Sequence, residues 1–204
     1  MKTYPSIPKD IRTDINIYAF DKLDGSNIRA EWSKKRGFYK FGTKTQMLGE
    51  DHPMFGSAIP LIKSGYEEGL TEVFAQQKYD NVVCFFEFYG PDSFAGHHKL
   101  EQMQVTLLDV SPLRKGILEP TEFINLFGHL GIPKVLYYGK ANSIFEEQVR
   151  TSTLEGMTFE GVICKAKNDK KIPMPIMFKI KSRAWLEKLK VFCKEDDKLF
   201  DQLA

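Results

Sequence analysis

The stretch INIYAFDKLDGSNIRAEW, residues 15–32, places a lysine, an aspartate and a glycine between two strand-like runs. Residues 15–20 are apolar enough for a buried strand, and residues 27–32 alternate between apolar and polar side chains, as half-buried strands do. Two interpretations of the intervening KLDG are open. Asp-Gly is a common hairpin turn and lysine is a common surface residue. Alternatively, Lys22 is a nucleophile held at the rim of a sheet.

The composition is that of an ordinary globular protein, with 204 residues of which 42% are hydrophobic and 27% are charged. This length suffices for one well-buried domain. No apolar run approaches membrane-spanning length and the first residues lack a signal-peptide core, so we expect a cytoplasmic protein with no membrane partner. Cys84, Cys164 and Cys193 have no metal-ligand spacing, which predicts small buried side chains.

The net charge is only +2, but it is unevenly distributed. Residues 165–190 hold nine basic and two acidic side chains, a local charge of +7 that leaves −5 for the rest of the chain. Such a stretch suits a polyanionic partner. Charge alone slightly favours the alternative, a solvated charged face.

The rest of the pattern predicts strands and helices without strict alternation. We expect further strands over residues 26–33, 38–42, 81–89, 102–110, 135–138, 159–165 and 174–181. Helices are expected over much of residues 57–79, with a break near 64–65, and over 120–130, 142–150 and 183–193, followed by a helix-like tail. This arrangement predicts a single α+β domain with two largely antiparallel sheets and peripheral helices.

Four features at strand ends carry side chains that suit chemistry. The first is KLDG at residues 22–25. The second is Glu87, a carboxylate in an otherwise apolar strand, where it needs a cation or a donor. The third is Glu160, at the mouth of the strand GVICK. The fourth is FKIK at residues 178–181, where alternation puts two lysines on one face, as if to hold an anion such as phosphate.

The order of these features resembles the covalent nucleotidyltransferase superfamily, which includes ATP-dependent DNA and RNA ligases and mRNA capping enzymes. KLDG is similar to the nucleophile motif, FFEFYG (residues 85–90) to the third motif, FEGVICK (159–165) to the fourth and FKIK to the fifth. LLDV (107–110) and GTKT (42–45) lie where the family has two further motifs. KLDGSN with EFYGPDSFAGHH most resembles the phage RNA ligase 2-like branch.

The resemblance implies an RNA ligase with a nucleotide cleft between its sheets and a three-step reaction. Lys22 attacks the α-phosphate of ATP and forms a lysyl–AMP, the AMP passes to a 5′-phosphate, and a 3′-hydroxyl then displaces it. RNA ends are the expected partner, with DNA as a possibility. The implied catalytic residues are Lys22, Lys179 and Lys181. The implied nucleotide-binding residues are Asp21, Lys22, Leu23, Asn27, Lys44, Glu87, Leu108, Glu160, Ile163, Lys179 and Lys181.

Family likeness also assigns supporting roles. Glu160 and Glu87 would hold Mg²⁺ or Mn²⁺, since carboxylate oxygens with phosphate suit these metals. Asp24 and Gly25 would shape the nucleophile turn. A lysine attacks only as a neutral amine, so the pKa of Lys22 should be lowered by nearby lysines and by the metal.

Two positions depart from the family pattern, and the chain is short. Leu108 stands where many relatives stack an aromatic ring on the purine, and Lys44 stands where many use arginine. We expect a nucleotidyltransferase domain over residues 1–185 and a short helical extension over 186–204, with no OB-fold domain. Such a minimal core suggests a partner protein that helps to grip the substrate.

Several alternatives are open. The rival functions are a DNA nick-sealing core, a GTP-using capping-type guanylyltransferase, and a nucleic-acid-binding protein that has lost turnover. His97 and His98 could touch phosphate or metal, or be solvated. Phe94 and Tyr89 could stack on a base or pack in the core. The tip at residues 34–36 could touch a phosphate backbone or be a solvated turn.

Overall fold

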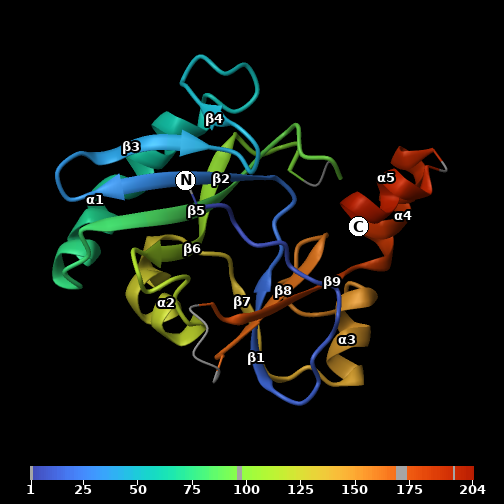
Figure 1. Ribbon diagram of the computed structural model, residues 1–204. Helices are drawn as coiled ribbons and strands as arrows, with labels where there is room; N and C mark the ends of the chain where they lie inside the picture. Colours follow the sequence, from blue (N-terminus) through green and yellow to red (C-terminus); the bar gives the residue numbers. More distant parts are fainter. Residues whose placement is uncertain (1, 96–97, 169–173, 195) are drawn as a thin grey trace.

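The runs on either side of KLDG form strands β1 (Asn16–Asp21) and β2 (Ser26–Ser33), and these strands do not pair with each other. In the computed structural model, which describes residues 2–95, 98–168, 174–194 and 196–204, they belong to different sheets (Figure 1). The hairpin interpretation of KLDG is therefore wrong. Residues 22–25 carry the chain from one sheet to the other.

Both sheets are antiparallel throughout. The four-stranded sheet has the order β7-β1-β8-β9, and the five-stranded sheet has the order β4-β3-β2-β5-β6. The strands not yet introduced are β3 (Gly37–Gly42), β4 (Met47–Leu48), β5 (Asn81–Tyr89), β6 (Gln104–Pro112), β7 (Val135–Lys140), β8 (Gly161–Ala166) and β9 (Ile176–Lys181). The predicted α+β class with two antiparallel sheets is confirmed. The short β4 was not predicted, because two residues give no periodicity.

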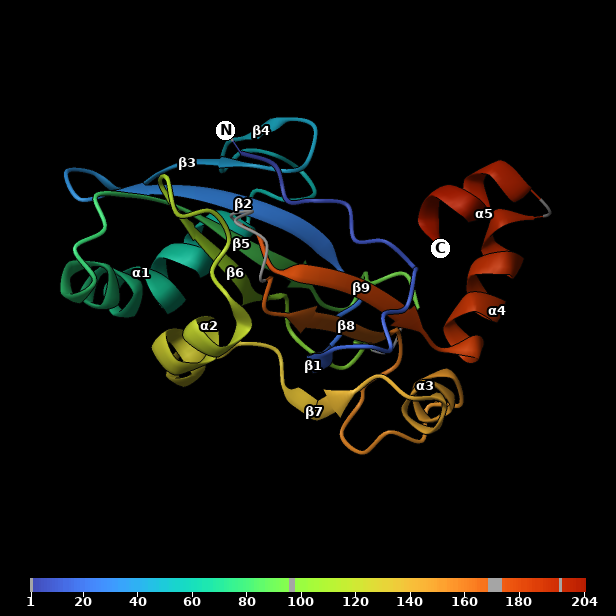
Figure 2. The same ribbon diagram turned by 60° about the horizontal axis from the view of Figure 1, so that its bottom comes forward.

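Helices α1, α2 and α3 lie against the two sheets, whereas α4 and α5 stand beyond the end of β9, as Figure 2 shows. Their bounds are α1 (Ala58–Gln76), α2 (Pro120–Phe127) with a 3₁₀ turn at Gly128–Leu130, α3 (Ser143–Arg150), α4 (Arg183–Cys193) and α5 (Asp197–Leu203). Helices α1 and α2 pack on the five-stranded sheet in one apolar core, and α3 packs on the four-stranded sheet in a second. A further apolar cluster, which includes Phe85 of β5 and Met177 of β9, joins the two sheets.

The predicted break in α1 at residues 64–65 is absent, and the helix runs through it. A glycine inside a helix costs only about 1 kcal/mol relative to alanine. Ile62 and Tyr66, on either side of the pair, are buried against the core. Their burial outweighs the weak propensity of Gly65.

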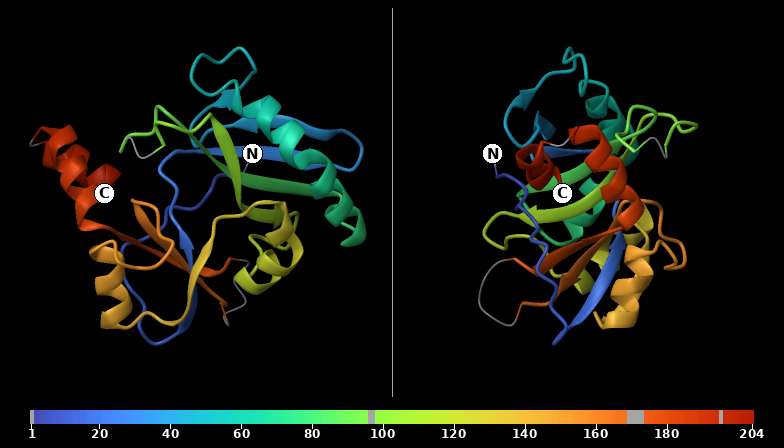
Figure 3. Two further views of the ribbon diagram at one scale, coloured as in Figure 1. Left: turned by 180° about the vertical axis from the view of Figure 1, so that it is seen from behind. Right: turned by 90° about the vertical axis from the view of Figure 1, so that its right-hand side faces the viewer.

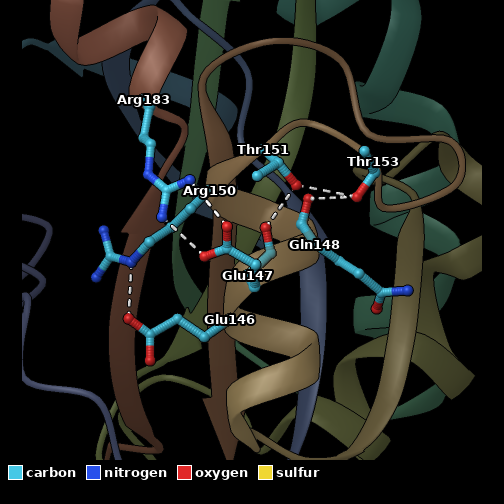
Figure 4. Close-up of polar contacts among 7 residues, drawn as sticks. All are labelled: Glu146, Glu147, Gln148, Arg150, Thr151, Thr153 and Arg183. Atoms are coloured by element: carbon cyan, nitrogen blue, oxygen red, sulfur yellow. Dashed lines mark hydrogen bonds and ion pairs between the residues drawn. The ribbon is translucent and has the colours of Figure 1, made fainter.

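Polar contacts fix helix α3 to the start of α4, as Figure 4 shows. Arg183 donates two hydrogen bonds to the carboxylate of Glu147, each of 2.8 Å. Arg150 donates to Glu146 at 2.7 Å. Asn142 caps the other end of α3 by accepting the backbone N–H of Phe145 at 2.8 Å. The Arg183–Glu147 contact joins the two helices, and the other two stabilise α3 itself.

Helices α4 and α5 form a small third core of their own. Trp185, Leu189 and Cys193 pack on Ala95 and Ala204, so α4 lies against the loop after β5 (Figure 3). The helical character predicted for the end of the chain is confirmed, and α4 begins at Arg183. The division at residue 185 stays a prediction.

Two further expectations were tested by the structure. Cys84, Cys164 and Cys193 are buried free thiols, as predicted. Within the part of the chain that the structure describes, no helix combines the length and apolarity needed to cross a membrane.

Phe86→Ala should destabilise the fold strongly, because Phe86 is fully buried between Phe38 and Tyr66. Removing such a ring costs about 3–5 kcal/mol of unfolding free energy. Phe192→Ala is the matched control, since Phe192 is 55% exposed and its loss should cost about 1 kcal/mol or less. Urea denaturation of both variants measures the difference, and equal losses would contradict the assignment of the core.

Candidate active site

The crossover brings Lys22 beside Glu160. The backbone N–H of Lys22 donates to the carbonyl of Gly161 at 2.9 Å, which extends the pairing of β1 with β8 by one residue. The Nζ atom of Lys22 then lies 2.8 Å from Oε1 of Glu160. The Nζ atom of Lys181, at the end of β9, lies 3.0 Å from the same oxygen. One carboxylate oxygen therefore holds two lysines.

Gly161 makes this approach of β8 and β9 possible. Its φ is +139°, a region that side chains disfavour. A Cβ at this position would meet the carbonyl oxygen of Ile180 at 2.1 Å. With glycine here, the backbone of β8 starts directly against β9. Glu160 is consequently placed beside Lys181.

Gly25 allows a similar close approach between the crossover and the five-stranded sheet. A Cβ there would meet the carbonyl oxygen of Phe88 at 2.4 Å, so the turn lies directly on β5. The backbone N–H of Gly25 hydrogen-bonds the carboxylate of Glu87. The carboxylate of Asp24 accepts the backbone N–H of Ala95 at 2.7 Å. The turn is thus fixed to two neighbouring segments.

A cavity of about 290 Å³ lies over this turn. Several predicted residues line it together: Asp21, Lys22, Leu23, Gly25, Asn27, Glu87, Leu108, Ile163 and Lys179. They come from β1, the crossover, β2, β5, β6, β8 and β9, so both sheets contribute to one site. The structure therefore brings together side chains that the sequence separates by more than 150 positions.

Other predicted residues are placed outside the cavity lining. Glu160 and Lys181 reach the site through their contacts with Lys22 and with each other. Asp24 supports the turn from behind. Lys44 is exposed and its Nζ donates to the hydroxyl of Ser6 at 3.2 Å. The geometry does not place Lys44 in the cavity, because Pro5 and Ile7 line the wall on that side.

The expected lowering of the Lys22 pKa is wrong for the protein without ligands. Burial lowers the pKa of Lys22, but Glu160, Glu87 and Asp24 together outweigh it, and the net shift is upward. Opposite charges favour the protonated amine more than the neighbouring lysines disfavour it. Lys22 is therefore held as a cation until these carboxylates are neutralised.

The neighbouring groups titrate near neutral pH. Burial raises the pKa of Glu87 to about 8, although Lys22 opposes the shift. Burial also lowers the pKa of Lys181 to about 8, with Glu160 opposing and Lys22 adding to the shift. The pKa of Lys179 is lowered by burial first and then by Lys22 and Lys9. Small changes in local charge can thus move protons within this cluster.

A buried ion pair between Lys165 and Asp109, joined by Tyr4, was not predicted from the sequence. Lys165 donates to Asp109 at 2.7 Å and to the carbonyl of Leu108 at 2.9 Å. The hydroxyl of Tyr4 donates to the same carboxylate of Asp109. Lys165 and Asp109 stand in the quoted motifs and could have been paired from them. Tyr4 could not, because the first fifteen residues have no periodicity.

The structure bears differently on the remaining residues for which the sequence left two interpretations. His98 is buried, packs on Tyr89 and contacts Glu101 at 2.8 Å, while His97 lies outside the described residues. Tyr89 is buried and its hydroxyl bonds with Thr106 at 3.0 Å, so the core interpretation is the correct one. Phe94 is 38% exposed. The tip at residues 34–36 is exposed, and Arg36 lies over the ring of Tyr39.

The donor set fits a magnesium or manganese ion only in part. Among the described residues, no three His, Cys, Asp or Glu side chains gather as a metal cage. Glu160 and Glu87 both act on Lys22 and offer oxygen ligands. Magnesium commonly takes one or two carboxylates and completes its shell with water and substrate phosphates. The pair therefore fits a metal that enters with a nucleotide.

Comparison with known proteins was made at the level of sequence and of fold. No protein-family model matches the sequence, and no curated protein matches it. Solved structures of an RNA ligase from Naegleria gruberi do match. A mutant with AMP and Mn superposes with a TM-score of 0.66 at 17% identity, over 92% of this chain and 59% of that chain. The ligase with PPi gives 0.65 at 18% identity, over 94% and 60%.

A third structure of this ligase, a mutant with ATP and Mn, gives a TM-score of 0.61 at 19% identity, over 85% of this chain and 51% of that chain. The predicted resemblance to RNA ligases is thus confirmed at the level of the fold, whereas the phage branch is not. The chain spans between about half and three-fifths of the length of these ligase chains. Over most of its own length it has the α+β nucleotidyltransferase fold of this RNA ligase.

Glu87→Gln should flatten the dependence of stability on pH in EDTA. The pKa of Glu87 is raised in the fold, so its contribution is complete below its ordinary value of 4.5 and is lost as pH rises through about 8. Unfolding free energies from urea titrations between pH 5 and 7.5 should fall more steeply for the unmodified protein than for the variant. The range stops there because Lys181, with its lowered pKa, gives the opposite slope at higher pH. Parallel profiles would refute the assignment.

Proposed function

We propose that the chain is an ATP-dependent polynucleotide ligase, acting on RNA in preference to DNA through a lysyl–AMP on Lys22. The observation that carries the proposal is the position of Lys22. Its amine lines the cavity and lies 2.8 Å from Glu160, inside a fold that RNA ligase structures share. ATP, AMP, PPi and Mn in those structures support the same nucleotide and metal for this chain.

In the first step, the neutral amine of Lys22 forms a P–N bond with the α-phosphorus of ATP. The P–O bond to pyrophosphate breaks, and pyrophosphate leaves. The nitrogen gives up its proton to solvent as the bond forms, and Oε1 of Glu160, 2.8 Å from Nζ, positions the amine before the attack. Lys179 lines the cavity and Lys181 shares Glu160, so both offset the charge that grows on the transferring phosphate.

A divalent cation at Glu160 and Glu87 would neutralise the carboxylates that keep Lys22 protonated, and would screen the phosphate charge. This resolves the conflict between the raised pKa of Lys22 and its role as nucleophile. Leu108 and Ile163 offer the apolar walls for the base. Asp21 has its carboxylate held by Thr158 at 2.9 Å, which leaves its backbone to line the cavity.

In the later steps, the AMP passes from Lys22 to the 5′-phosphate of a polynucleotide, and the P–N bond breaks. A 3′-hydroxyl then attacks that phosphate, the new phosphodiester forms, and AMP leaves with its phosphate. Both steps reuse the same cationic surroundings, because charge develops again on a phosphate oxygen.

Lys22→Ala should abolish covalent labelling by ATP that carries a radioactive α-phosphate. The protein is first stripped of bound AMP with pyrophosphate, then incubated with magnesium or manganese and denatured. We expect the label on the chain to fall at least about 100-fold in the variant, since the proposal assigns the bond to phosphorus to this amine alone. Lys35→Ala, on the exposed turn after β2, is the matched control and should label normally.

GTP is tested beside ATP, and preferential labelling by GTP would indicate a guanylyltransferase instead. An unmodified protein that takes no label from either nucleotide would refute the enzyme and leave a binding protein. If ATP labels Lys22, nicked duplexes with RNA or DNA at the 3′-hydroxyl side then separate RNA from DNA ligation.

The labelling rate should rise with pH. The raised pKa of Lys22 means that the amine is protonated at neutral pH and that only its small neutral fraction reacts. We expect a rise of up to about tenfold per pH unit on the acid side of the profile. Joining of RNA that is already adenylated at its 5′ end serves as the control, because it bypasses the amine. A labelling rate that is flat between pH 6 and 9 would argue against this account.

A further inference from the structure

A surface groove of about 770 Å³ lies between the loop after β5 and helix α4. It is separate from the nucleotide cavity, and among the described residues the two share no lining side chain. In Figure 1 the loop, drawn in green, points toward the red helices at this place. The side chains that give the groove its character are Phe94, Phe159, Phe192, Lys99 and Lys188.

The aromatic side chains of the groove are unusually exposed. Phe192 is 55% exposed on α4 and Phe94 is 38% exposed on the loop. Their rings meet edge to face, with centroids 4.9 Å apart at 81°. The buried anchor of this region is Trp185, which lies beneath Phe94. Phe192 therefore contributes little to the core, and an exposed aromatic pair of this kind marks a binding surface.

Positive charge accompanies the rings. Lys99 is exposed at one wall, and Lys188 at the other lies over the ring of Phe159 at 4.8 Å. Lys188 donates one hydrogen bond to the carbonyl of Ala95 at 2.8 Å, and its ammonium has two donors left. Glu187 is the acidic side chain in the lining, and Lys190 and Lys194 extend the charge along α4. The surface is net positive.

Both walls of the groove contact residues at or next to the candidate catalytic lysines. On the loop, the N–H of Ala95 donates to Asp24, two residues after Lys22. On the helix, the ring of Trp185 lies 3.6 Å from the ammonium of Lys181. A ligand in the groove would consequently end near the turn that carries the nucleophile.

We propose that this groove binds a single-stranded segment of the polynucleotide substrate, next to the end that is joined. Bases stack on Phe94 and Phe192, and backbone phosphates contact Lys99 and Lys188. Aromatic platforms beside lysines are the combination that holds single strands without regard to sequence. The inference rests on the proposed ligase function, but its binding step can be measured without any turnover.

The test uses the full chain and a fluorescein-labelled, 5′-phosphorylated single-stranded RNA of twelve nucleotides. Fluorescence anisotropy gives its dissociation constant for the unmodified protein and for Phe192→Leu, Phe192→Trp and Lys99→Ala. We expect Phe192→Leu to weaken binding about tenfold and Phe192→Trp to preserve it, because stacking needs a ring. Lys99→Ala should weaken binding and reduce its salt dependence.

Control variants distinguish RNA binding in the groove from the proposed ligase function. Lys140→Ala and Ile144→Ala remove an exposed lysine and an exposed aliphatic side chain that do not line the groove, and should bind normally. Labelling of Lys22 by ATP should be unchanged in the groove variants. An unmodified protein that takes no label from ATP would refute the ligase function. RNA binding that depends on the ring of Phe192 would still support the groove as an RNA-binding site.

Two results would overturn the proposal. One is an unmodified protein that does not bind the RNA at 100 μM. The other is Phe192→Leu binding as well as the unmodified protein, which would mean that the rings only offer apolar surface, as a protein partner or a second copy of the chain would require.

Discussion

The site depends on one buried carboxylate oxygen. Oε1 of Glu160 accepts from Lys22 and Lys181, and without it two ammonium groups would face each other in a region largely closed to water. Breaking a buried ion pair by removing one partner is strongly destabilising, because the remaining charge is left uncompensated. Burial brings the pKa of Glu87 up and that of Lys181 down to about 8, and Glu160 opposes the shift of Lys181.

Two glycines allow the backbone approaches that place Glu160 and Glu87 beside Lys22. Gly161 allows β8 to begin against β9, and Gly25 lets the crossover lie on β5, so that each sheet contributes a carboxylate to the same lysine. The cores of the two sheets are not separate, because Phe20 of β1 packs in the core of the five-stranded sheet, and Phe85 of β5 shares a further cluster with Met177 of β9. The candidate site lies where the strand ends of the two sheets converge.

Sequence reasoning singled out side chains that the structure brings together. Lys22, Glu87, Glu160, Lys179 and Lys181 were chosen from strand alternation and motif order, and they gather around the crossover, while their roles stay predictions. Sequence reasoning failed where placement depends on tertiary contacts. The hydrogen bond from Lys44 to Ser6, the hydrogen bond from Tyr4 to Asp109 and the continuity of α1 across Gly65 leave no local pattern. The upward shift of the Lys22 pKa was missed for a related reason, since its sign is set by distances to carboxylates from three different segments.

The carbonyl of Leu203 accepts a hydrogen bond from Lys181 at 3.0 Å, and Tyr4 lines the cavity over residues 22–25. The site thus joins residues that are almost two hundred positions apart, and β1 pairs with β7 and β8 across more than a hundred residues. Contacts of such long range slow folding, because the chain loses the entropy of closing a large loop before the stabilising contacts form. Strand β1 and the turn at residues 22–25 therefore stay without their partners until residues 135–166 are available, and an unpaired apolar strand is prone to aggregate.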